Sequence, residues 1–498
     1  MIGTIMSEPV RGTSGQKISA TALADLLGRW SAAGGPLYRL LAARIVRLTD
    51  AGELPASLRL PAERDLASAL SVSRNTVAAA YQLLRDDGMA ESRQGAATRI
   101  VPHRTTPAAV HRANGFFADL LEASAVDADL SLATVDCAPQ VAAALADPAA
   151  ILDPGESAAV TRTTGYFPHG LPALRAAIAG HLTDRLRLPS SAGQVVVTTG
   201  AQQALDLLIR SEVLPGQSAA VEDPTFPGAL DALHRAGARV IGVPAADGLD
   251  PEQLEHAVRT HRPALVYLIP SYHNPTGRLM PAAHRERIAR LAASCPETLF
   301  VDDMTLAELP LGDGPALAFR PLAAIGSSQP NVVTVGSLSK LYWGGLRTGW
   351  IRASEGLIAR LAAAKAAADQ GSAAFQQAIT AELLRGPHDE IVKWRGEWLR
   401  ARYDALAGAL RASLPEWTWA EPDGGLTVWV RLPGHADGGA FAQAALRHGV
   451  AVVPGRLLSA EAGDVRTAGE YVRLAYIQPP DLLRAAVRTL AAIPARSR

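Results

Sequence analysis

The stretch that decides the fold is Asn331-Val332-Val333-Thr334-Val335, which leads into Ser337-Leu338-Ser339-Lys340 and then Arg347-Thr348-Gly349-Trp350. Its β-branched residues predict a buried strand, so Lys340 lies just past a carboxyl end, where α/β sheets bind ligands. The chain has four lysines, and a lysine, unlike an arginine, can lose its proton and attack a carbonyl carbon. Two serines and an arginine around such an amine would suit a phosphorylated aldehyde. The alternative is a solvent-exposed lysine in an ordinary loop.

Length and composition limit the possible classes of protein. With 498 residues, of which 48% are apolar, the chain predicts two or three domains with sizeable cores. Its formal net charge of zero gives no overall attraction to nucleic acid or membrane, so any such signal must be local. Two distant cysteines, Cys137 and Cys295, suggest no disulfide framework. No apolar run of about 18 residues and no secretory leader is found, so we expect a cytoplasmic protein without a membrane span.

The first hundred residues predict three helices followed by a β-wing. Apolar residues share one face of a helix from Pro36, a second short helix follows Pro61, and a third begins at Ser73, a favourable N-cap. Gly88 ends the third helix. Two short strands, 89–92 and 98–101, then flank a turn.

The third helix carries the signal for nucleic-acid binding. Its first turn, Arg74-Asn75-Thr76, is polar and faces away from the apolar stripe of Val77, Tyr81 and Leu84. A recognition helix reads base edges with its N-terminal residues, and arginine suits guanine. Residues 36–101 contain nine arginines and seven acidic residues, a mildly basic balance of +2. A helical domain that binds protein, or nothing, remains the alternative.

The run Leu60-Pro61-Ala62-Glu63-Arg64-Asp65-Leu66-Ala67, followed by Val72-Ser73-Arg74-Asn75-Thr76-Val77, resembles the winged helix-turn-helix of the GntR regulators. The resemblance implies binding to double-stranded DNA. The residues that it assigns to DNA are Arg64, Ser73, Arg74, Asn75 and Thr76, with Gln94 and Gly95 at the wing tip. One departure is the wing turn, which is Gly95-Ala96-Ala97-Thr98 where the family usually has Gly-x-Gly-Thr.

Beyond a Pro- and Thr-containing linker at 102–129, strands and helices alternate, which predicts a mostly parallel sheet. A region from about 388 to 498 predicts a smaller α+β lobe. The expected strands are Gln194–Thr198, Ala219–Glu222, Val240–Val243, Ala264–Ile269, Thr298–Val301, Val332–Val335 and Trp350–Ala353.

Polar residues follow these strands. Gly200 opens a helix whose exposed N–H groups favour a phosphate, and Asn274 offers an amide in a Pro-containing turn. Asp302 and Asp303 end an apolar strand, where a carboxylate is costly unless it finds a cationic partner such as a pyridinium nitrogen. Helix-capping aspartates and a metal site are the alternatives. No His/Cys cluster lies nearby in the sequence, and we expect no metal.

These elements, in the order phosphate helix, Asn274-Pro275-Thr276-Gly277, Asp302-Asp303, Ser-x-Ser-Lys and x-Arg-x-Gly, resemble the fold-type I aminotransferases, which use pyridoxal 5′-phosphate (PLP). The resemblance spans about 160–480 and implies that Lys340 binds the cofactor covalently. It further implies Asp302 at the pyridine nitrogen, Asn274 near the ring oxygen and Arg473 on a substrate carboxylate. The remaining cofactor residues that it implies are Gly200, Ala201, Gln202, Ser337, Ser339 and Arg347 at the phosphate, Phe226 stacked on the ring, and Tyr166 reaching the phosphate of a neighbouring subunit.

One departure concerns catalysis. Relatives of this kind usually have a tyrosine two or three residues after the aspartate, which donates to the ring oxygen. This chain has Asp302-Asp303-Met304-Thr305-Leu306, and methionine cannot donate a hydrogen bond. We therefore expect no efficient turnover, although residual aminotransferase activity is compatible with the other residues.

The whole chain resembles the MocR/GabR regulators, in which a GntR-type head is fused to an aminotransferase-like domain. The resemblance implies an N-terminal extension at 1–35, a DNA-binding domain at 36–101, a linker at 102–129 and a PLP-binding domain at 130–498. It implies a homodimeric transcription factor that senses PLP or an amino-acid-like effector. The alternatives are an active aminotransferase with a secondary DNA-binding domain, and a protein-interaction module on an inactive PLP fold.

Overall fold

The computed structural model describes residues 17–32, 35–55, 57–92, 98–101, 126–152, 154–312, 319–326, 330–460 and 468–493. These residues form two compact units. The first contains the described residues up to 101 together with 439–447, which make up most of α16 (Gly438–Arg447). The second contains the remainder from Val126 onward.

The first unit is a helix-turn-helix with a two-stranded wing. Its elements are α1 (Ala20–Leu27), α2 (Leu37–Asp50), α3 (Glu63–Ala69), α4 (Arg74–Asp86), β1 (Ala90–Glu91) and β2 (Arg99–Ile100). The strands pair antiparallel, with Ala90 opposite Ile100. The predicted order of helices and strands is confirmed for this head.

Helix α4 begins where the sequence predicts it. The Ser73 hydroxyl accepts a hydrogen bond of 3.1 Å from the Thr76 backbone N–H, which also donates 3.0 Å to the Ser73 carbonyl oxygen. The side chains of Val77, Tyr81 and Leu84 are buried in the core of the head. This packing fixes which face of α4 remains available to a ligand.

Helix α1 also belongs to the head. Leu23, Ala24 and Leu27 are buried in the same core as α2, α3 and α4. The Arg44 Nε donates a hydrogen bond of 3.1 Å to the Leu27 carbonyl oxygen, which ties α1 to α2. The ordered head therefore extends N-terminal of residue 36, into the segment that the sequence marks as an extension.

The second unit is built on a seven-stranded sheet in the order β4-β10-β9-β8-β7-β5-β6. β10 runs antiparallel to β4 and β9, and the other strands are parallel. Each strand lies within two residues of a predicted one, which confirms the mostly parallel sheet. The bounds are β4 (Val195–Thr198), β5 (Ser218–Asp223), β6 (Arg239–Pro244), β7 (Leu265–Leu268), β8 (Leu299–Asp303), β9 (Val332–Ser337) and β10 (Gly349–Arg352).

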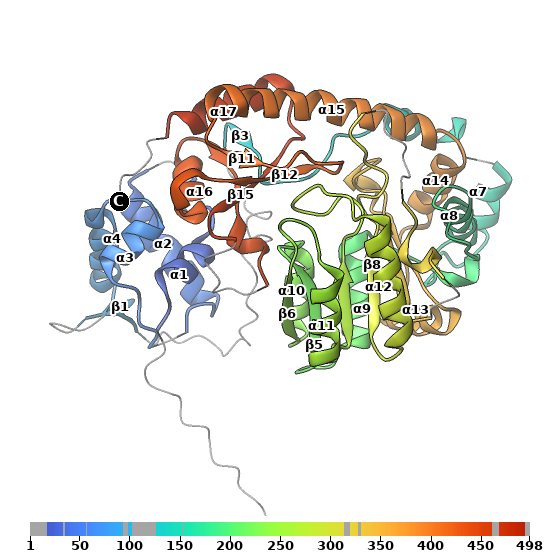
Figure 1. Cartoon of the computed structure of the whole chain (residues 1–498), viewed down its shortest axis with the longest axis horizontal. Helices are drawn as coiled ribbons and strands as arrows, with labels where there is room; N and C mark the ends of the chain where they lie inside the picture. Colours follow the sequence, from blue (N-terminus) through green and yellow to red (C-terminus); the bar gives the residue numbers. More distant parts are fainter. Residues whose placement is uncertain are drawn as a thin grey trace, which may run out of the picture. The chain divides into compact units, whose positions relative to one another are not determined.

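Helices cover both faces of this sheet (Figure 1). One face packs against α9 (Ala201–Glu212), α10 (Pro227–Arg235) and α13 (Glu355–Asp369), and the other against α11 (Pro251–His261) and α12 (Ala282–Ser294). A strand covered on both faces must be apolar along its length, which explains the fully buried Val195–Thr198 and Leu265–Leu268. Polar groups concentrate at the strand ends as a result.

A smaller lobe follows the large sheet, as predicted. Its four-stranded antiparallel sheet has the order β11-β12-β15-β14, and the long helix α15 lies alongside α17 above it (Figure 1). The bounds are α15 (His388–Ser413), β11 (Thr418–Trp419), β12 (Thr427–Arg431), β14 (Val453–Pro454), β15 (Tyr471–Ala475) and α17 (Pro480–Ala491).

The N-terminal end of the second unit joins this lobe. β3 (Ala128–Asp129) pairs parallel with β13 (Val450–Ala451), so the last residues of the predicted linker include a strand. The other helices are α6 (Pro139–Ala146), α7 (Pro154–Thr161), α8 (Pro172–Asp184) and α14 (Ala374–Arg385). Short 3₁₀ turns lie at Pro148–Ala150, Ala192–Gln194, Leu322–Ala324, Gly344–Leu346, Pro433–His435 and Gly455–Leu458.

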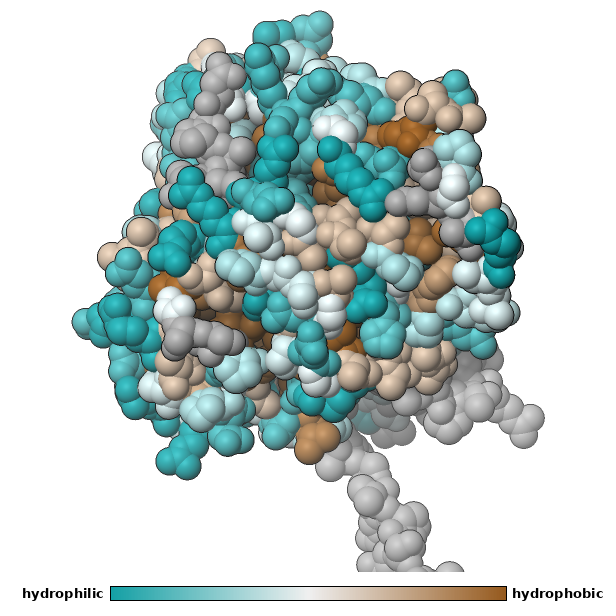
Figure 2. Space-filling view, turned by 90° about the vertical axis from the view of Figure 1, so that its right-hand side faces the viewer, coloured by the Kyte–Doolittle hydropathy of each residue, from teal (hydrophilic) through white to brown (hydrophobic). Residues whose placement is uncertain are grey.

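The surface of the second unit is largely polar on the face shown in Figure 2, where apolar residues form small separate spots among hydrophilic ones. Across the described ranges, no helix is both long enough and apolar enough to cross a membrane.

Candidate functional site

Lys340 lies three residues beyond the end of β9, as its strand predicted. Its Nζ donates a hydrogen bond of 2.8 Å to the Ala133 carbonyl oxygen. Burial, together with the positive charges of Arg473 and Arg347, lowers the pKa of the Lys340 amine to about 8. A sizeable fraction of this amine is therefore unprotonated near neutral pH, which is the form that attacks a carbonyl carbon.

Three residues predicted at the phosphate converge beside α9. Gly200 is the N-cap of α9 and has a φ of 130°, which a residue with a side chain rarely adopts. A Cβ placed on Gly200 would lie 3.6 Å from Arg347 Nη2 and 3.8 Å from Ser339 Oγ. The first turn of a helix has N–H groups without acceptors inside the helix, and Ala201 stands there. Backbone donors, a hydroxyl and a guanidinium therefore surround one small space that suits a phosphate.

Two other residues predicted at the phosphate, Ser337 and Gln202, form hydrogen bonds with neighbouring residues. The Ser337 Oγ accepts a hydrogen bond of 3.2 Å from the Ser339 N–H and lies 3.1 Å from the Ser339 hydroxyl. Ser337 thus orients Ser339. The Gln202 Nε2 donates 2.9 Å to the Gly228 carbonyl oxygen, so the side chain of Gln202 anchors the start of α10.

The structure distinguishes the two adjacent aspartates. Asp303 Oδ2 accepts a hydrogen bond of 2.7 Å from the Tyr267 hydroxyl, and Asp303 Oδ1 accepts one of 2.9 Å from the Thr305 N–H. Asp302 Oδ2 accepts one of 2.8 Å from the Leu322 N–H, but Asp302 Oδ1 is buried and has no partner among the described residues. A buried oxygen without a donor costs free energy, and a ring N–H of a bound cofactor would supply that donor.

The charge around Asp302 is unusual for a protein core. Burial raises the pKa of Asp302 to about 6, against the opposing effect of the Arg285 guanidinium. Burial also raises the pKa of Glu222 to about 8, although its Oε2 accepts a hydrogen bond of 2.7 Å from the Ile269 N–H. Arg285 is itself fully buried, with its Cζ 4.4 Å from the centre of the Phe319 ring. Near neutral pH, Glu222 is therefore uncharged and Asp302 is the carboxylate that faces Arg285.

Arg473 and Asn274, predicted from separate motifs, are brought together. Arg473 Nη1 donates 3.4 Å to Asn274 Oδ1, and its Nη2 donates to the Ser131 carbonyl oxygen. Burial lowers the pKa of Arg473 to about 10, and the nearby Asp129 opposes this shift. A buried guanidinium remains charged at that pKa and is suited to a substrate carboxylate.

The sequence interpretation missed three groups of residues at this site. Glu222 is the penultimate residue of β5 and carried a weak signal, because a carboxylate near the end of an apolar strand is costly. Arg285 lies in an amphipathic helix and gave no signal. The segment 129–133, whose carbonyl groups contact Lys340 and Arg473, falls where the sequence predicts a linker and lobe start, and nothing in its residue types marks it.

The two predicted aromatic residues differ in their surroundings. Phe226 is the N-cap residue of α10. A Cβ on Gly228 would come within 2.5 Å of its ring, so Phe226 packs beside Gly228, whose carbonyl oxygen accepts the hydrogen bond from Gln202. Tyr166 lies between α7 and α8 with 65% of its surface exposed. An exposed tyrosine is free to contact another molecule.

Met304 and Thr305 stand two and three residues after Asp302, the two places where the resemblance expects a tyrosine. Met304 is 6% exposed, and its backbone N–H donates 2.8 Å to the Val335 carbonyl oxygen, which fixes it beside β9. The thioether cannot donate to a ring oxygen. Taken together, the amine, the unpartnered Asp302 oxygen and the phosphate-binding groups fit PLP, and no tyrosine stands at 304 or 305.

In the head, the predicted DNA-binding residues of α3 and α4 lie on the surface. Arg74 is 71% exposed at its side chain and its Nε donates 3.1 Å to Glu63 Oε2, while Arg64 and Asn75 are exposed. Ser73 uses its hydroxyl to cap α4, so only part of its hydrogen-bonding capacity remains for DNA. The predicted wing residues Gln94 and Gly95 lie outside the described residues.

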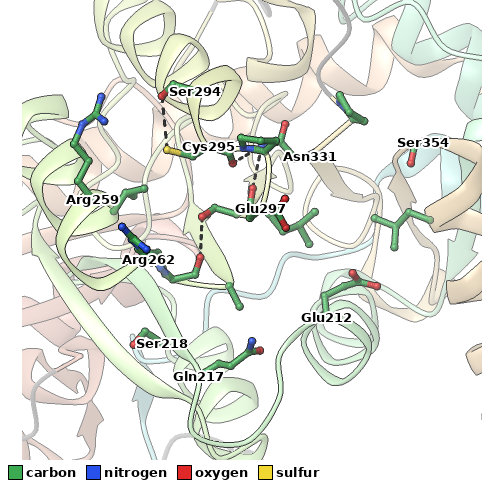
Figure 3. Close-up of a pocket in the computed structure, with 18 of the residues that line it drawn as sticks. Glu212, Gln217, Ser218, Arg259, Arg262, Ser294, Cys295, Glu297, Asn331 and Ser354 are labelled. Carbon is green, nitrogen blue, oxygen red and sulfur yellow. Dashed lines mark hydrogen bonds between the residues drawn. The ribbon is translucent and has the colours of Figure 1, made fainter.

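A separate hollow of about 1100 Å³ lies at the opposite edge of the large sheet (Figure 3). It is lined by residues at the amino ends of the parallel strands, among them Ser218, Leu299 and Asn331, with Arg262 and Glu297 at its side. The length of the strands separates this hollow from Lys340. None of the predicted site residues lines it.

Comparisons with known proteins agree with this geometry. The family model described as aminotransferase class I and II matches residues 130–488, and the one described as bacterial regulatory proteins, gntR family, matches residues 37–100.

Among individual proteins, the HTH-type transcriptional regulator YisV of Bacillus subtilis is 28% identical over 461 residues, covering 88% of this chain and 93% of that protein. The 2-aminoadipate transaminase of Thermus thermophilus is 32% identical over 316 residues, covering 63% and 75%. The crystal structure of LysN, an alpha-aminoadipate aminotransferase from Thermus thermophilus complexed with N-(5′-phosphopyridoxyl)-L-leucine, aligns with a TM-score of 0.64 at 29% identity, covering 76% of this chain and 94% of that chain.

The first prediction separates Asp302 from Asp303. Asp302→Asn should weaken PLP binding by at least tenfold and shift the absorption band of the bound cofactor, because an amide stabilises a ring N–H less than a carboxylate does. Asp303→Asn should lower thermal stability, since it disturbs the Tyr267 hydrogen bond, while the band stays in place. Spectrophotometric titration of both variants measures this. If Asp303→Asn moved the band and Asp302→Asn did not, the assignment would be reversed.

The second prediction concerns the pH dependence of cofactor loading. Because the pKa of Lys340 is lowered to about 8, its reactive free amine is gained as pH rises through that value. Below pH 8 the rate of borohydride-trappable PLP loading should rise about tenfold per pH unit, and above pH 8 it should level off. Arg473→Gln removes a repelling charge and should move the midpoint upward. Loading that still accelerates up to pH 10 in the wild type would contradict a perturbed lysine.

Proposed function

The chain belongs to the aminotransferase class I and II family and is a GntR-type, DNA-binding transcriptional regulator that uses PLP, and we propose that its aminotransferase fold senses an amino-acid-like effector or PLP itself. The observation that carries the proposal is the presence, in one chain, of an exposed polar first turn on α4 and a buried amine at Lys340 with Asp302 and a phosphate cradle.

Different residues around Lys340 bind different groups of an amino acid. The cofactor supplies an aldehyde that reacts with primary amines and a ring that attracts electrons. Arg473 binds the effector carboxylate with two parallel hydrogen bonds, and Asn274 orients its guanidinium. Asp302 would hold a ring N–H of the cofactor. Lys340 would hold the cofactor through its amine nitrogen, and only after an incoming amine had replaced it could the released Lys340 amine take up a proton.

An effector must also displace part of the chain. Lys340 Nζ donates to the Ala133 carbonyl oxygen, and Arg473 Nη2 to that of Ser131. PLP held by Lys340 would take over the first donor and an effector carboxylate on Arg473 the second, so that together they would release residues 131–133 from both contacts. These residues follow closely after the segment that leads from the DNA-binding head. We propose that this release couples the pocket to DNA binding, since coupling requires the ligand to favour one arrangement over another.

Met304 favours a sensor over an efficient enzyme. Without the tyrosine hydroxyl that relatives add to the asparagine at the ring oxygen, the electronic tuning of the cofactor would be weaker and a bound amine would stay longer. A sensor gains from a long-lived complex, whereas an enzyme needs rapid release. The alternative, an active aminotransferase with a secondary DNA-binding domain, is favoured by the intact Lys340 and Arg473 and by the similarity to transaminases.

We further propose that the protein is a cytoplasmic homodimer. The exposed side chain of Tyr166 supports an interface, because the resemblance assigns this tyrosine to the phosphate of the neighbouring subunit. Two heads in a dimer would contact two DNA half-sites.

The third prediction tests the DNA-binding surface. Arg74→Ala should cost about 1–3 kcal/mol of specific binding if Arg74 contacts a base edge. The matched control is Arg85→Ala in the last turn of α4, roughly 16 Å further along the helix axis, which should have little effect. Fluorescence anisotropy with a promoter fragment at a stated salt concentration measures both, and PLP loading should be unchanged. Equal binding by Arg74→Ala and the wild type would refute the role of this helix turn.

The fourth prediction separates sensing from turnover. Holo-protein mixed with an amino-acid panel and a keto-acid acceptor should show a spectral change with a cognate amine and altered operator affinity. Its transamination rate should fall far below the median enzyme value of roughly 10 s⁻¹. Arg473→Gln should load PLP yet lose the response to carboxylate-bearing amines. Repeated turnovers at ordinary enzyme rates, with operator binding indifferent to PLP and amine, would establish the aminotransferase instead.

A further inference from the structure

A second cluster of ionisable side chains is buried outside the PLP site. His181 lies in α8, Glu308 follows β8, and His388 is the first residue of α15. Their side chains are 2%, 13% and 3% exposed. None of them has a role in the chemistry derived above for Lys340. The cluster joins segments that are 127 and 80 residues apart in sequence.

The donor atoms in this cluster already have the spacing of metal ligands. His181 Nε2 lies 3.1 Å from Glu308 Oε2, and His388 Nε2 lies 2.8 Å from Glu308 Oε1. One ligand atom from each residue lies within 4.8 Å of the other two. In a tetrahedral site with bonds of about 2.0–2.2 Å, neighbouring ligand atoms are about 3.3 Å apart. Small side-chain rotations would therefore direct the three residues at one point.

Tyr342 determines which nitrogen of His388 carries hydrogen. The Tyr342 hydroxyl donates 3.1 Å to the Leu383 carbonyl oxygen, which can only accept, and it lies 2.9 Å from His388 Nδ1. With its proton committed to Leu383, the Tyr342 oxygen accepts a hydrogen bond from His388 Nδ1–H. A neutral His388 with hydrogen on Nδ1 has a lone pair on Nε2. That lone pair faces the Glu308 carboxyl group 2.8 Å away.

Two lone pairs at that distance repel unless a cation lies between them. A proton on His388 Nε2 would satisfy this pair, but His181 approaches the same carboxyl group, and the two imidazole rings have their centres 4.6 Å apart. A neutral His181 with hydrogen on Nε2 can donate to the same carboxylate, so one proton or one metal ion would balance the charge of Glu308. A single divalent ion satisfies all three residues at once. Histidine ligands of metals commonly donate their other ring N–H to a neighbouring acceptor, as His388 does to Tyr342.

We propose that His181, Glu308 and His388 form a binding site for a divalent transition metal ion of the zinc type, with water in the fourth position. Two imidazoles and one carboxylate suit zinc better than magnesium or calcium, which prefer oxygen donors. The ion would tie α8, the segment after β8 and the start of α15 together. Because Tyr342 lies two residues after Lys340, the site would also fix the far side of the lysine loop.

The sequence did not reveal this site. The expectation of no metal rested on the lack of a His/Cys cluster near Asp302 and Asp303. Glu308 lies only five residues beyond Asp303, but its histidine partners come from distant helices. A helix with one histidine on a buried face is usually ordinary core packing, so neither His181 nor His388 stood out.

The experiment uses untagged full-length protein that has been treated with a chelator and dialysed. Isothermal titration with Zn²⁺, with elemental analysis of the complex, should give about one ion per chain, and Co²⁺ in its place should show the visible bands of a tetrahedral site. Glu308→Gln and His388→Gln should lose this binding. The matched control is His256→Gln, which changes an exposed histidine of α11 and should bind as the wild type does. Tyr342→Phe keeps all three ligands and should weaken zinc binding about tenfold or more.

The wild-type titration does not depend on the stability of any variant, and PLP absorbance reports whether each variant is folded. If the dialysed wild type took up no zinc at micromolar concentrations, or if Glu308→Gln bound it unchanged, the site would be disproved. A wild type without zinc whose His388 is an imidazolium by nuclear magnetic resonance would show that a proton provides the positive charge instead.

Discussion

The structure depends on how buried carboxyl groups are accommodated where the apolar parallel strands have their C-terminal ends. Asp302, Asp303 and Glu222 are all buried there, and Arg285 is the guanidinium that lies among them. Three ionised carboxylates could not share that space, because each would lose its hydration without enough positive charge in return. The fold accommodates each of the three carboxyl groups in a different way. Glu222 is uncharged near neutral pH, Asp303 is hydrogen-bonded through both oxygens, and Asp302 keeps one oxygen for a ligand.

The parts of the site that could be predicted are those with a local signal in the sequence. Lys340 and Asp302 could be placed because each follows a run of β-branched or apolar residues, and parallel strands bring their carboxyl ends to one edge. The seven strands were predicted for the same reason, since burial on both faces gives each a continuous apolar run. Helix α4 was predicted from its Ser73 cap and its apolar stripe. Each of these signals lies within a dozen residues of sequence.

The groups that escaped prediction act only through distant contacts. Arg285 has the sequence context of a surface helix residue, and only the fold shows that it is buried against Phe319. Residues 131–133 act through backbone carbonyl groups, which are identical in every residue type. The choice between Asp302 and Asp303 required the Tyr267 and Thr305 hydrogen bonds, and Tyr267 lies in another strand. Sequence patterns report local burial, whereas partners that come from other elements depend on topology.

The two sides of the lysine loop differ in whether a ligand can take over their hydrogen bonds. On one side, Tyr342 is hydrogen-bonded to Leu383 and His388, inside a core that no effector needs to enter. On the other side, Lys340 is hydrogen-bonded to Ala133, through a backbone oxygen that a ligand on the amine would displace. Under the proposed function, ligand binding at Lys340 therefore acts on the contact that a ligand can displace. Because that contact belongs to the segment that follows the linker to the head, the asymmetry of the loop would give a ligand in the pocket a way to influence DNA binding.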